Sequence, residues 1–204
     1  IVDPFISANE LAKNIDVKSL KADYILVTHA HGDHILDVET IANNTGAVIV
    51  SNAEITAYYE SKGFKTHPMN HGGSWMFDFG KVKYVNAIHS SSFPDGSYAG
   101  AAAGFVVQAG EQTFYYAGDT ALYSDMKYIG EKYKLDVAFL PIGSNFTMDL
   151  EDALTAATYI GATQVIGMHY DTFPYIAIEH QATLELAKES NIELTLMEIG
   201  QTIS

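Results

Sequence analysis

Four residues in one short stretch have the types and the spacing of metal ligands. The stretch reads Thr28-His29-Ala30-His31-Gly32-Asp33-His34. Neutral imidazole nitrogens are good ligands for borderline divalent ions, and a carboxylate adds negative charge to a site. His29 and His31 project to the same side of an extended segment, since they are two residues apart. Gly32 allows a sharp turn that carries Asp33 and His34 onto a second direction, at the start of a following helix. One loop can therefore serve two ions side by side.

Three further candidate ligands come shortly after predicted strands. His89 directly follows a strand over 81–88, and His169 directly follows a strand over 165–168. Asp119 comes after a strand over 113–116, with two residues between them. Because ligands gather beyond the carboxyl ends of strands in α/β architectures, we expect these side chains to complete the sites that the first loop begins. The remaining histidines, His67, His71 and His180, lack this context and are not assigned.

The segments that must position these side chains alternate between strand-like and helix-like patterns. We expect strands over 24–27, 47–50, 81–87, 104–107, 113–116, 137–140, 165–168 and 194–199. We expect helices over 35–43, 52–61, 124–133, 151–160 and 178–189. Hairpins end the first half, and strands alternate with helices in the second. The pattern predicts one α/β domain over 1–204, a sheet sandwich covered by helices on its outer faces.

Composition narrows the function further. The chain has 204 residues and no cysteine, which excludes a disulfide framework, a thiolate zinc site and a cysteine nucleophile. Acidic residues number 25 and basic residues 11, all of them lysine, so the formal charge is −14. A nucleic-acid partner needs a positive surface, so we expect a small-molecule substrate and no nucleic acid. Neither a membrane span nor a signal peptide is visible, which predicts a cytoplasmic protein without a membrane partner. The oligomeric state is left open.

The order of the candidate ligands resembles the metallo-β-lactamase superfamily over the whole chain. Longer strings resemble the bacterial UPF0173 group of metal-dependent hydrolases, related to the ascorbate-6-phosphate lactonase branch. Those strings are Val2-Asp3-Pro4-Phe5, Gly72-Gly73-Ser74-Trp75, Ala87-Ile88-His89-Ser90-Ser91, Ala117-Gly118-Asp119-Thr120, Pro141-Ile142-Gly143-Ser144-Asn145-Phe146-Thr147-Met148 and His169-Tyr170-Asp171-Thr172-Phe173-Pro174. The resemblance implies a four-layer αβ/βα sandwich, the metallo-β-lactamase fold. Family members normally begin with an extra hairpin, so we expect strands upstream of Ile1.

The resemblance also implies a role for each ligand. A first ion would be held by His29, His31 and His89, a second by Asp33, His34 and His169, and Asp119 would bridge the two.

Seven ligands around two divalent ions, zinc or manganese, indicate a two-metal hydrolase. We expect a hydroxide shared by the ions to attack a small ester, lactone or phosphoester. Asp33 and Asp119 are the predicted catalytic residues, and Asp33 would orient the nucleophile. The predicted substrate pocket comprises Ser90, Ser91, Asn145, Thr147, Tyr170 and Thr172.

Some roles stay open. Tyr170, Asp171 and Thr172 are candidates for a general acid or for support of His169, and Asp3 is a candidate support of the His31 loop.

Other readings of the same residues are a nucleic-acid phosphodiesterase of this fold and a non-enzymatic metal-binding module. The acidic charge opposes the first, and the complete ligand set opposes the second. An oxygen-handling di-iron protein would carry a carboxylate where His31 stands. A true β-lactamase is disfavoured because the longer strings match another group.

Overall fold

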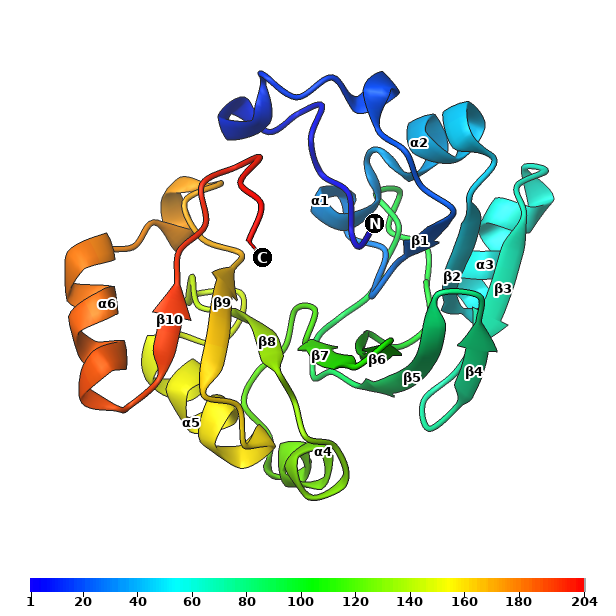
Figure 1. Cartoon of the computed structure of the whole chain (residues 1–204). Coiled ribbons are helices and arrows are strands. Elements are labelled where there is room, and N and C mark those ends of the chain that lie inside the picture. The colour runs from blue at the N-terminus through cyan, green and yellow to red at the C-terminus, as the bar shows by residue number, and fades with distance from the viewer. Residues whose placement is uncertain (204) are drawn as a thin grey trace. The chain divides into compact units, whose positions relative to one another are not determined.

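The computed structural model describes residues 1–203 and groups them into two compact units. Unit 1 comprises Ile1–Gly73, Ser90–Ala102 and the described residues from Ile199 onward; unit 2 comprises Ser74–His89 and Ala103–Glu198. Each unit contains one sheet, and the strands of both are labelled in Figure 1. The units are described separately below, and the single domain expected over 1–204 stays a prediction.

Unit 1 is built on a parallel sheet in the order β1-β2-β3, with β1 at Tyr24–Leu26, β2 at Val48–Asn52 and β3 at Thr66–Met69. Its helices are α1 (Gly32–Ile35), α2 (Val38–Thr45) and α3 (Ala53–Ser61), and short 3-10 turns lie at Glu10–Ala12 and Val17–Ser19. Side chains of α2 and α3 pack with those of the sheet in one core, whose fully buried members include Ile25, Ile41, Ile49, Ile55 and Tyr59.

Local chemistry sets the helix ends of unit 1. The Asn52 side chain caps α3 by accepting a hydrogen bond from the Ile55 amide at 2.8 Å, as the sequence predicted. The helix expected over 35–43 begins only at Val38. Asp37 interrupts it, because its carboxylate accepts hydrogen bonds from the amides of Ile6 and Ser7, at 2.6 Å and 2.9 Å.

Unit 2 contains a seven-stranded sheet in the order β10-β9-β8-β7-β6-β5-β4. Its strands are β4 (Ser74–Phe77), β5 (Gly80–Asn86), β6 (Ala103–Ala109), β7 (Gln112–Tyr116), β8 (Val137–Pro141), β9 (Gln164–Met168) and β10 (Glu193–Thr195). Its helices are α4 (Lys127–Lys132), α5 (Leu150–Ile160) and α6 (His180–Glu189), with 3-10 turns at Ser124–Met126 and Pro174–Ile176. The expected order of hairpins followed by alternating strands and helices is confirmed. The sequence did not predict β3 or β4, and β10 is shorter than expected.

Strand direction in unit 2 determines where the candidate ligands lie. Pairing is antiparallel from β4 to β7 and parallel from β7 to β10. Because β5 and β7 are both antiparallel to β6, they run in the same direction as β8 and β9. His89, Asp119 and His169 therefore follow strands whose carboxyl ends meet at one edge of the sheet.

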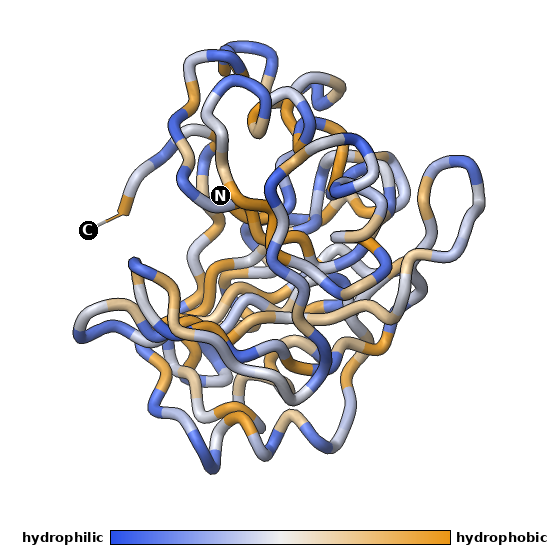
Figure 2. Tube along the Cα trace, turned by 90° about the vertical axis from the view of Figure 1, so that its right-hand side faces the viewer, coloured by the Kyte–Doolittle hydropathy of each residue, from blue (hydrophilic) through white to orange (hydrophobic). Residues whose placement is uncertain are grey.

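Helices α4, α5 and α6 cover one face of this sheet. Their side chains share one core with the strands, including Ile129, Leu154, Ala187, Tyr115 and Leu140. Figure 2 colours the trace by hydropathy, and many of its outer turns are hydrophilic. Among residues 1–203, no helix combines the length and apolarity needed to cross a bilayer.

Candidate functional site

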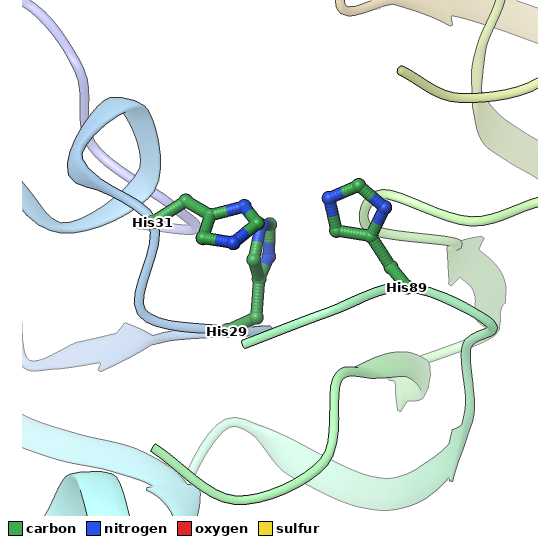
Figure 3. A group of neighbouring side chains, drawn as sticks. All are labelled: His29, His31 and His89. Atoms are coloured by element: carbon green, nitrogen blue, oxygen red, sulfur yellow. The ribbon is translucent and has the colours of Figure 1, made fainter. Parts of the chain in front are cut away.

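The loop after β1 brings two imidazole nitrogens of unit 1 together. His29 is fully buried and His31 is half-buried, and Figure 3 shows both side chains on this loop. Nε2 of His29 lies 3.0 Å from Nδ1 of His31. Two nitrogens that each bind one tetrahedral zinc ion at about 2.0–2.1 Å are about 3.3 Å apart. The pair therefore has close to the spacing of two ligands of a single ion.

The same loop presents a second pair of donors. Helix α1 begins at Gly32, three residues before the predicted helix start, and carries Asp33 and His34 in its first turn. Oδ2 of Asp33 lies 3.7 Å from Nε2 of His34. The His34 ring is buried beside that of His29, with centroids 4.1 Å apart. One loop of unit 1 thus offers two adjacent pairs of metal-type donors.

The buried Asp3 carboxylate orients the His34 ring directly and the His29 ring through Thr28. Oδ1 of Asp3 accepts a hydrogen bond from the Thr28 amide at 2.8 Å. Oδ2 of Asp3 accepts one from the Thr28 hydroxyl at 2.7 Å and lies 3.0 Å from Nδ1 of His34. The Thr28 hydroxyl is also 2.9 Å from Nδ1 of His29. Both rings are therefore assigned a proton on Nδ1, which leaves the Nε2 lone pair of each for an ion.

Asp3, His29 and His34 also form a cluster of donor atoms that by itself could hold an ion. The hydrogen bonds of Asp3 argue against a ligand role, because both of its oxygens accept from Thr28 or His34. Its geometry is that of a carboxylate that orients ligating histidines, the support role predicted for it.

Two serines of the predicted pocket lie in unit 1 with different surroundings. The exposed Ser90 has its Oγ 3.3 Å from Nε2 of His31. Ser91 is half-buried; its Oγ accepts from the Ala30 amide at 3.3 Å and donates to the Ala99 carbonyl at 3.2 Å. Ser91 therefore fastens the loop, whereas the place of Ser90 in a substrate pocket stays a prediction.

Unit 2 gathers its three candidate ligands around one carboxylate oxygen. Oδ2 of Asp119 lies 3.1 Å from Nε2 of His169 and 3.5 Å from Nε2 of His89. The Asp119 side chain is 4% exposed, so this oxygen lies in a largely buried environment. His89 is also drawn in Figure 3. A carboxylate oxygen that faces two imidazole nitrogens at these distances can bind one ion together with both or bridge two ions, so the bridging role of Asp119 stays a prediction.

A hydrogen bond and a close backbone approach within unit 2 hold these loops in place. The Thr120 hydroxyl accepts a hydrogen bond from the Ile88 amide at 3.0 Å, which ties the Asp119 loop to the residue before His89. His169 has a φ of 56°, in the left-handed region. A Cβ at Gly143 would lie 2.1 Å from the His169 carbonyl oxygen, so only glycine fits beside that ligand.

The segment after His169 is also fastened. Asp171 accepts hydrogen bonds from the Ile178 amide at 3.0 Å and from Nε2 of His180 at 2.5 Å. Both of its oxygens are thereby engaged, which favours support of the loop over a role as general acid. The sequence left His180 unassigned, because nothing in the spacing indicates this pairing.

The other predicted pocket residues lie on loops of unit 2. Tyr170 is half-buried, and burial, together with the charge of Asp171, raises the pKa of its hydroxyl. The Thr172 hydroxyl donates to the Tyr170 carbonyl at 3.4 Å. Asn145 is exposed with a φ of 57°, and Thr147 is half-buried. Their place in a substrate pocket stays a prediction.

The donor set fits divalent ions of the zinc and manganese type. It consists of five imidazoles and two carboxylates, and the chain has no thiolate to add. The tautomers assigned in unit 1 leave Nε2 lone pairs that such ions can bind, and the Asp119 oxygen in unit 2 lies at ligand spacing from an imidazole nitrogen.

Comparison with known proteins gives consistent matches. A family model described as a beta-lactamase superfamily domain matches residues 1–170. A UPF0173 metal-dependent hydrolase of Flavobacterium johnsoniae is 62% identical over 203 residues, covering 100% of this chain and 90% of the relative. One from Christiangramia forsetii is 59% identical over 204 residues, with the same two coverages.

Among solved structures, Igni18, described as a novel metallo hydrolase from the hyperthermophilic archaeon Ignicoccus hospitalis, matches with a TM-score of 0.89. It is 35% identical, and the match covers 99% of this chain and 88% of that one. The likeness confirms the fold class predicted from the sequence.

Proposed function

Because this chain belongs to the β-lactamase superfamily, in the group of UPF0173 metal-dependent hydrolases, we propose that it hydrolyses a small ester, lactone or phosphoester with two divalent ions, zinc or manganese. The ligands would be His29, His31, Asp33, His34, His89, Asp119 and His169. This assignment draws on both units and rests on the chemistry of the donors and on family membership.

The observation that carries the dinuclear proposal is that the loop after β1 offers two donor pairs, His29 with His31 and Asp33 with His34, each of which suits one ion. Oδ2 of Asp119 faces the Nε2 atoms of His89 and His169, at 3.5 Å and 3.1 Å. With one of these imidazoles on each ion, as the family pattern implies, this oxygen would bridge the two.

The chain's own residues would position the reaction. Bound ions would lower the pKa of a water molecule and polarise the substrate oxygen. Asp3 would keep the His34 proton on Nδ1, and Thr28 would do the same for His29. The Asp33 carboxylate, in the first turn of α1, would orient the attacking water. Ser90, beside His31, would contact the substrate.

The charge of the chain favours a small substrate over a nucleic acid. With a formal charge of −14 and no arginine, the chain has few cationic side chains that could neutralise a phosphate backbone. We therefore propose a small-molecule partner and no nucleic-acid partner.

A substrate panel tests the proposed function. Protein stripped of metal and then loaded with zinc or manganese is offered p-nitrophenyl acetate, a simple lactone, p-nitrophenyl phosphate and a structured RNA. We expect metal-dependent turnover of at least one small substrate and none of the RNA. His89→Ala should abolish that turnover, whereas His67→Ala, a half-buried histidine on β3, should preserve it. Cleavage of the RNA alone would contradict the proposal.

A further inference from the structure

The cationic side chains of unit 2 lie at the end of the sheet opposite to its candidate ligands. Lys81 and Lys83 lie in the first half of β5, Lys134 precedes β8, and Lys188 lies near the end of α6, which leads to the start of β10. Lys127 and Lys132 belong to α4, which leads to the start of β8. The charges of Lys132 and Lys81, after burial, help to lower the pKa of Lys83, which agrees with their proximity.

The loops that carry the ligands contain no cationic side chain other than histidine. Lysine is absent from 22–61, from 84–126 and from 135–187, and the chain has no arginine. These ranges include every loop that follows a ligand-bearing strand. The loops after β8 and β9 add negative charge instead, at Asp149, Asp171 and Glu179. An anionic group on the part of a substrate that does not react would therefore meet no cationic side chain of these loops.

Two exposed aromatic rings occupy the loops after β8 and β9, at the same end of the sheet as the candidate ligands of unit 2. Phe146 follows β8 and is 51% exposed, and Tyr175 follows β9 and is 76% exposed. Their ring centroids are 6.3 Å apart, with planes at 77°, so the rings form an edge-to-face pair. Large apolar groups that gather on the surface beside polar functional groups are typical of ligand-binding sites.

The pair is fixed close to the ligand His169. Gly143 packs against the His169 carbonyl oxygen and against the Ile176 side chain, as the 2.1 Å and 2.9 Å approaches of a hypothetical Cβ show. Ile176 is fully buried and directly follows Tyr175, while Phe146 is three residues beyond Gly143. The Asp171 amide also donates to the Ile176 carbonyl at 2.9 Å. Both aromatic residues thus stand on anchored loops next to a candidate metal ligand.

Building on the proposed function, we propose that the substrate is a neutral carboxylic ester or lactone whose apolar group packs on Phe146 and Tyr175. In the reaction, the oxygen of water bonds to the acyl carbon and the acyl C–O bond breaks. One proton of that water reaches the leaving alcohol oxygen, and the acid product releases its own proton to solvent. Phe146 and Tyr175 act as specificity-determining residues, which take no part in the proton transfers.

The test compares three p-nitrophenyl substrates with one leaving group: the acetate, the hexanoate and the phosphate. Metal-loaded wild type should have a higher kcat/KM for the hexanoate than for the acetate, and the lowest for the phosphate. Phe146→Ala and Tyr175→Ala should each lower kcat/KM for the hexanoate by about tenfold, mainly through KM, because apolar contact is lost. The acetate should change less than twofold. Phe146→Leu should restore most of the hexanoate activity.

Tyr128→Ala is the matched control, since Tyr128 is 68% exposed on α4, among the lysines. It should leave all three substrates unchanged, and an unchanged Tm should show that each variant is folded. Equal wild-type kcat/KM for acetate and hexanoate, or a preference for the phosphate, would overturn the inference but leave the proposed hydrolase intact. Loss of acetate turnover as large as the loss of hexanoate turnover would also overturn it. Absence of turnover of any ester, lactone or phosphoester would contradict the proposed function itself.

Discussion

Replacing Asp3 by asparagine should weaken metal binding without unfolding the protein. In the wild type, both carboxylate oxygens accept hydrogen bonds, Oδ1 from the Thr28 amide and Oδ2 from the Thr28 hydroxyl and His34 Nδ1. The asparagine amide presents one oxygen and one NH₂ group. In one orientation the NH₂ group faces the Thr28 amide, which would lose its acceptor and loosen the loop that carries the ligands. In the other it faces His34, which can relieve the conflict only by moving its proton to Nε2, the atom needed by an ion.

The size of the effect follows from the kind of contact that is lost. Carboxylates that orient metal-ligating histidines contribute about 10- to 100-fold to metal affinity, or about 1.4–2.7 kcal/mol. Asp3 contacts His34 directly and reaches His29 through the Thr28 hydroxyl. Because it acts on two ligands and its side chain is only 2% exposed, we expect a loss near the upper end of this range.

Competition with a chromophoric chelator measures this loss as a change in the apparent Kd for zinc. Glu60→Gln is the matched control, since it removes the same charge from an exposed position on α3. The control should bind zinc as the wild type does, and circular dichroism should show both variants to be folded. Zinc affinity of Asp3→Asn within twofold of the wild type would refute the assigned tautomers and the support role of Asp3.

The remaining predictions concern stability and metal dependence. Asn52→Ala should lower the free energy of unfolding by about 2 kcal/mol or more, because α3 loses its cap and the buried Ala99 carbonyl loses a donor at 2.8 Å; a change below 0.5 kcal/mol in urea unfolding would contradict this. Burial lowers the pKa of His67 below 6.5, so its contribution to stability is present above that pH and is lost as the pH falls below it. His67→Gln should therefore lose less stability than the wild type between pH 7 and pH 5, and equal losses in paired urea titrations would argue against it. Prolonged chelation should abolish hydrolysis, and added zinc or manganese should restore it; turnover that persists in metal-free protein would show that the ions are not needed.

Much of the ligand geometry could be predicted because it is local in the sequence. The two-residue spacing of His29 and His31, and the turn at Gly32, are enough to place four donors on one loop. The strand ends before His89 and His169 could be located from their apolar runs. The periodicity of apolar residues therefore predicted the order of the elements, and the strand ends indicated which residues are candidate ligands.

What the sequence left unspecified depends on contacts between distant residues. The carboxylate of Asp3 reaches Thr28, 25 positions away, and no local pattern indicates which oxygen accepts which hydrogen bond. Strand β3 contains Pro68, and β4 exposes Trp75 and Met76, so neither shows the alternation by which a strand is recognised. The break before α2 similarly follows from Asp37 binding the amides of residues 6 and 7.

The most direct test of the central claim is the metal content of the protein after reconstitution with zinc and removal of unbound ions. The account predicts about two ions per chain for the wild type, measured by inductively coupled plasma mass spectrometry. Asp119→Ala should lower this number, because the oxygen that faces both His89 and His169 is lost. A wild-type content near zero or near one, or an undiminished content of two in Asp119→Ala, would contradict the dinuclear centre.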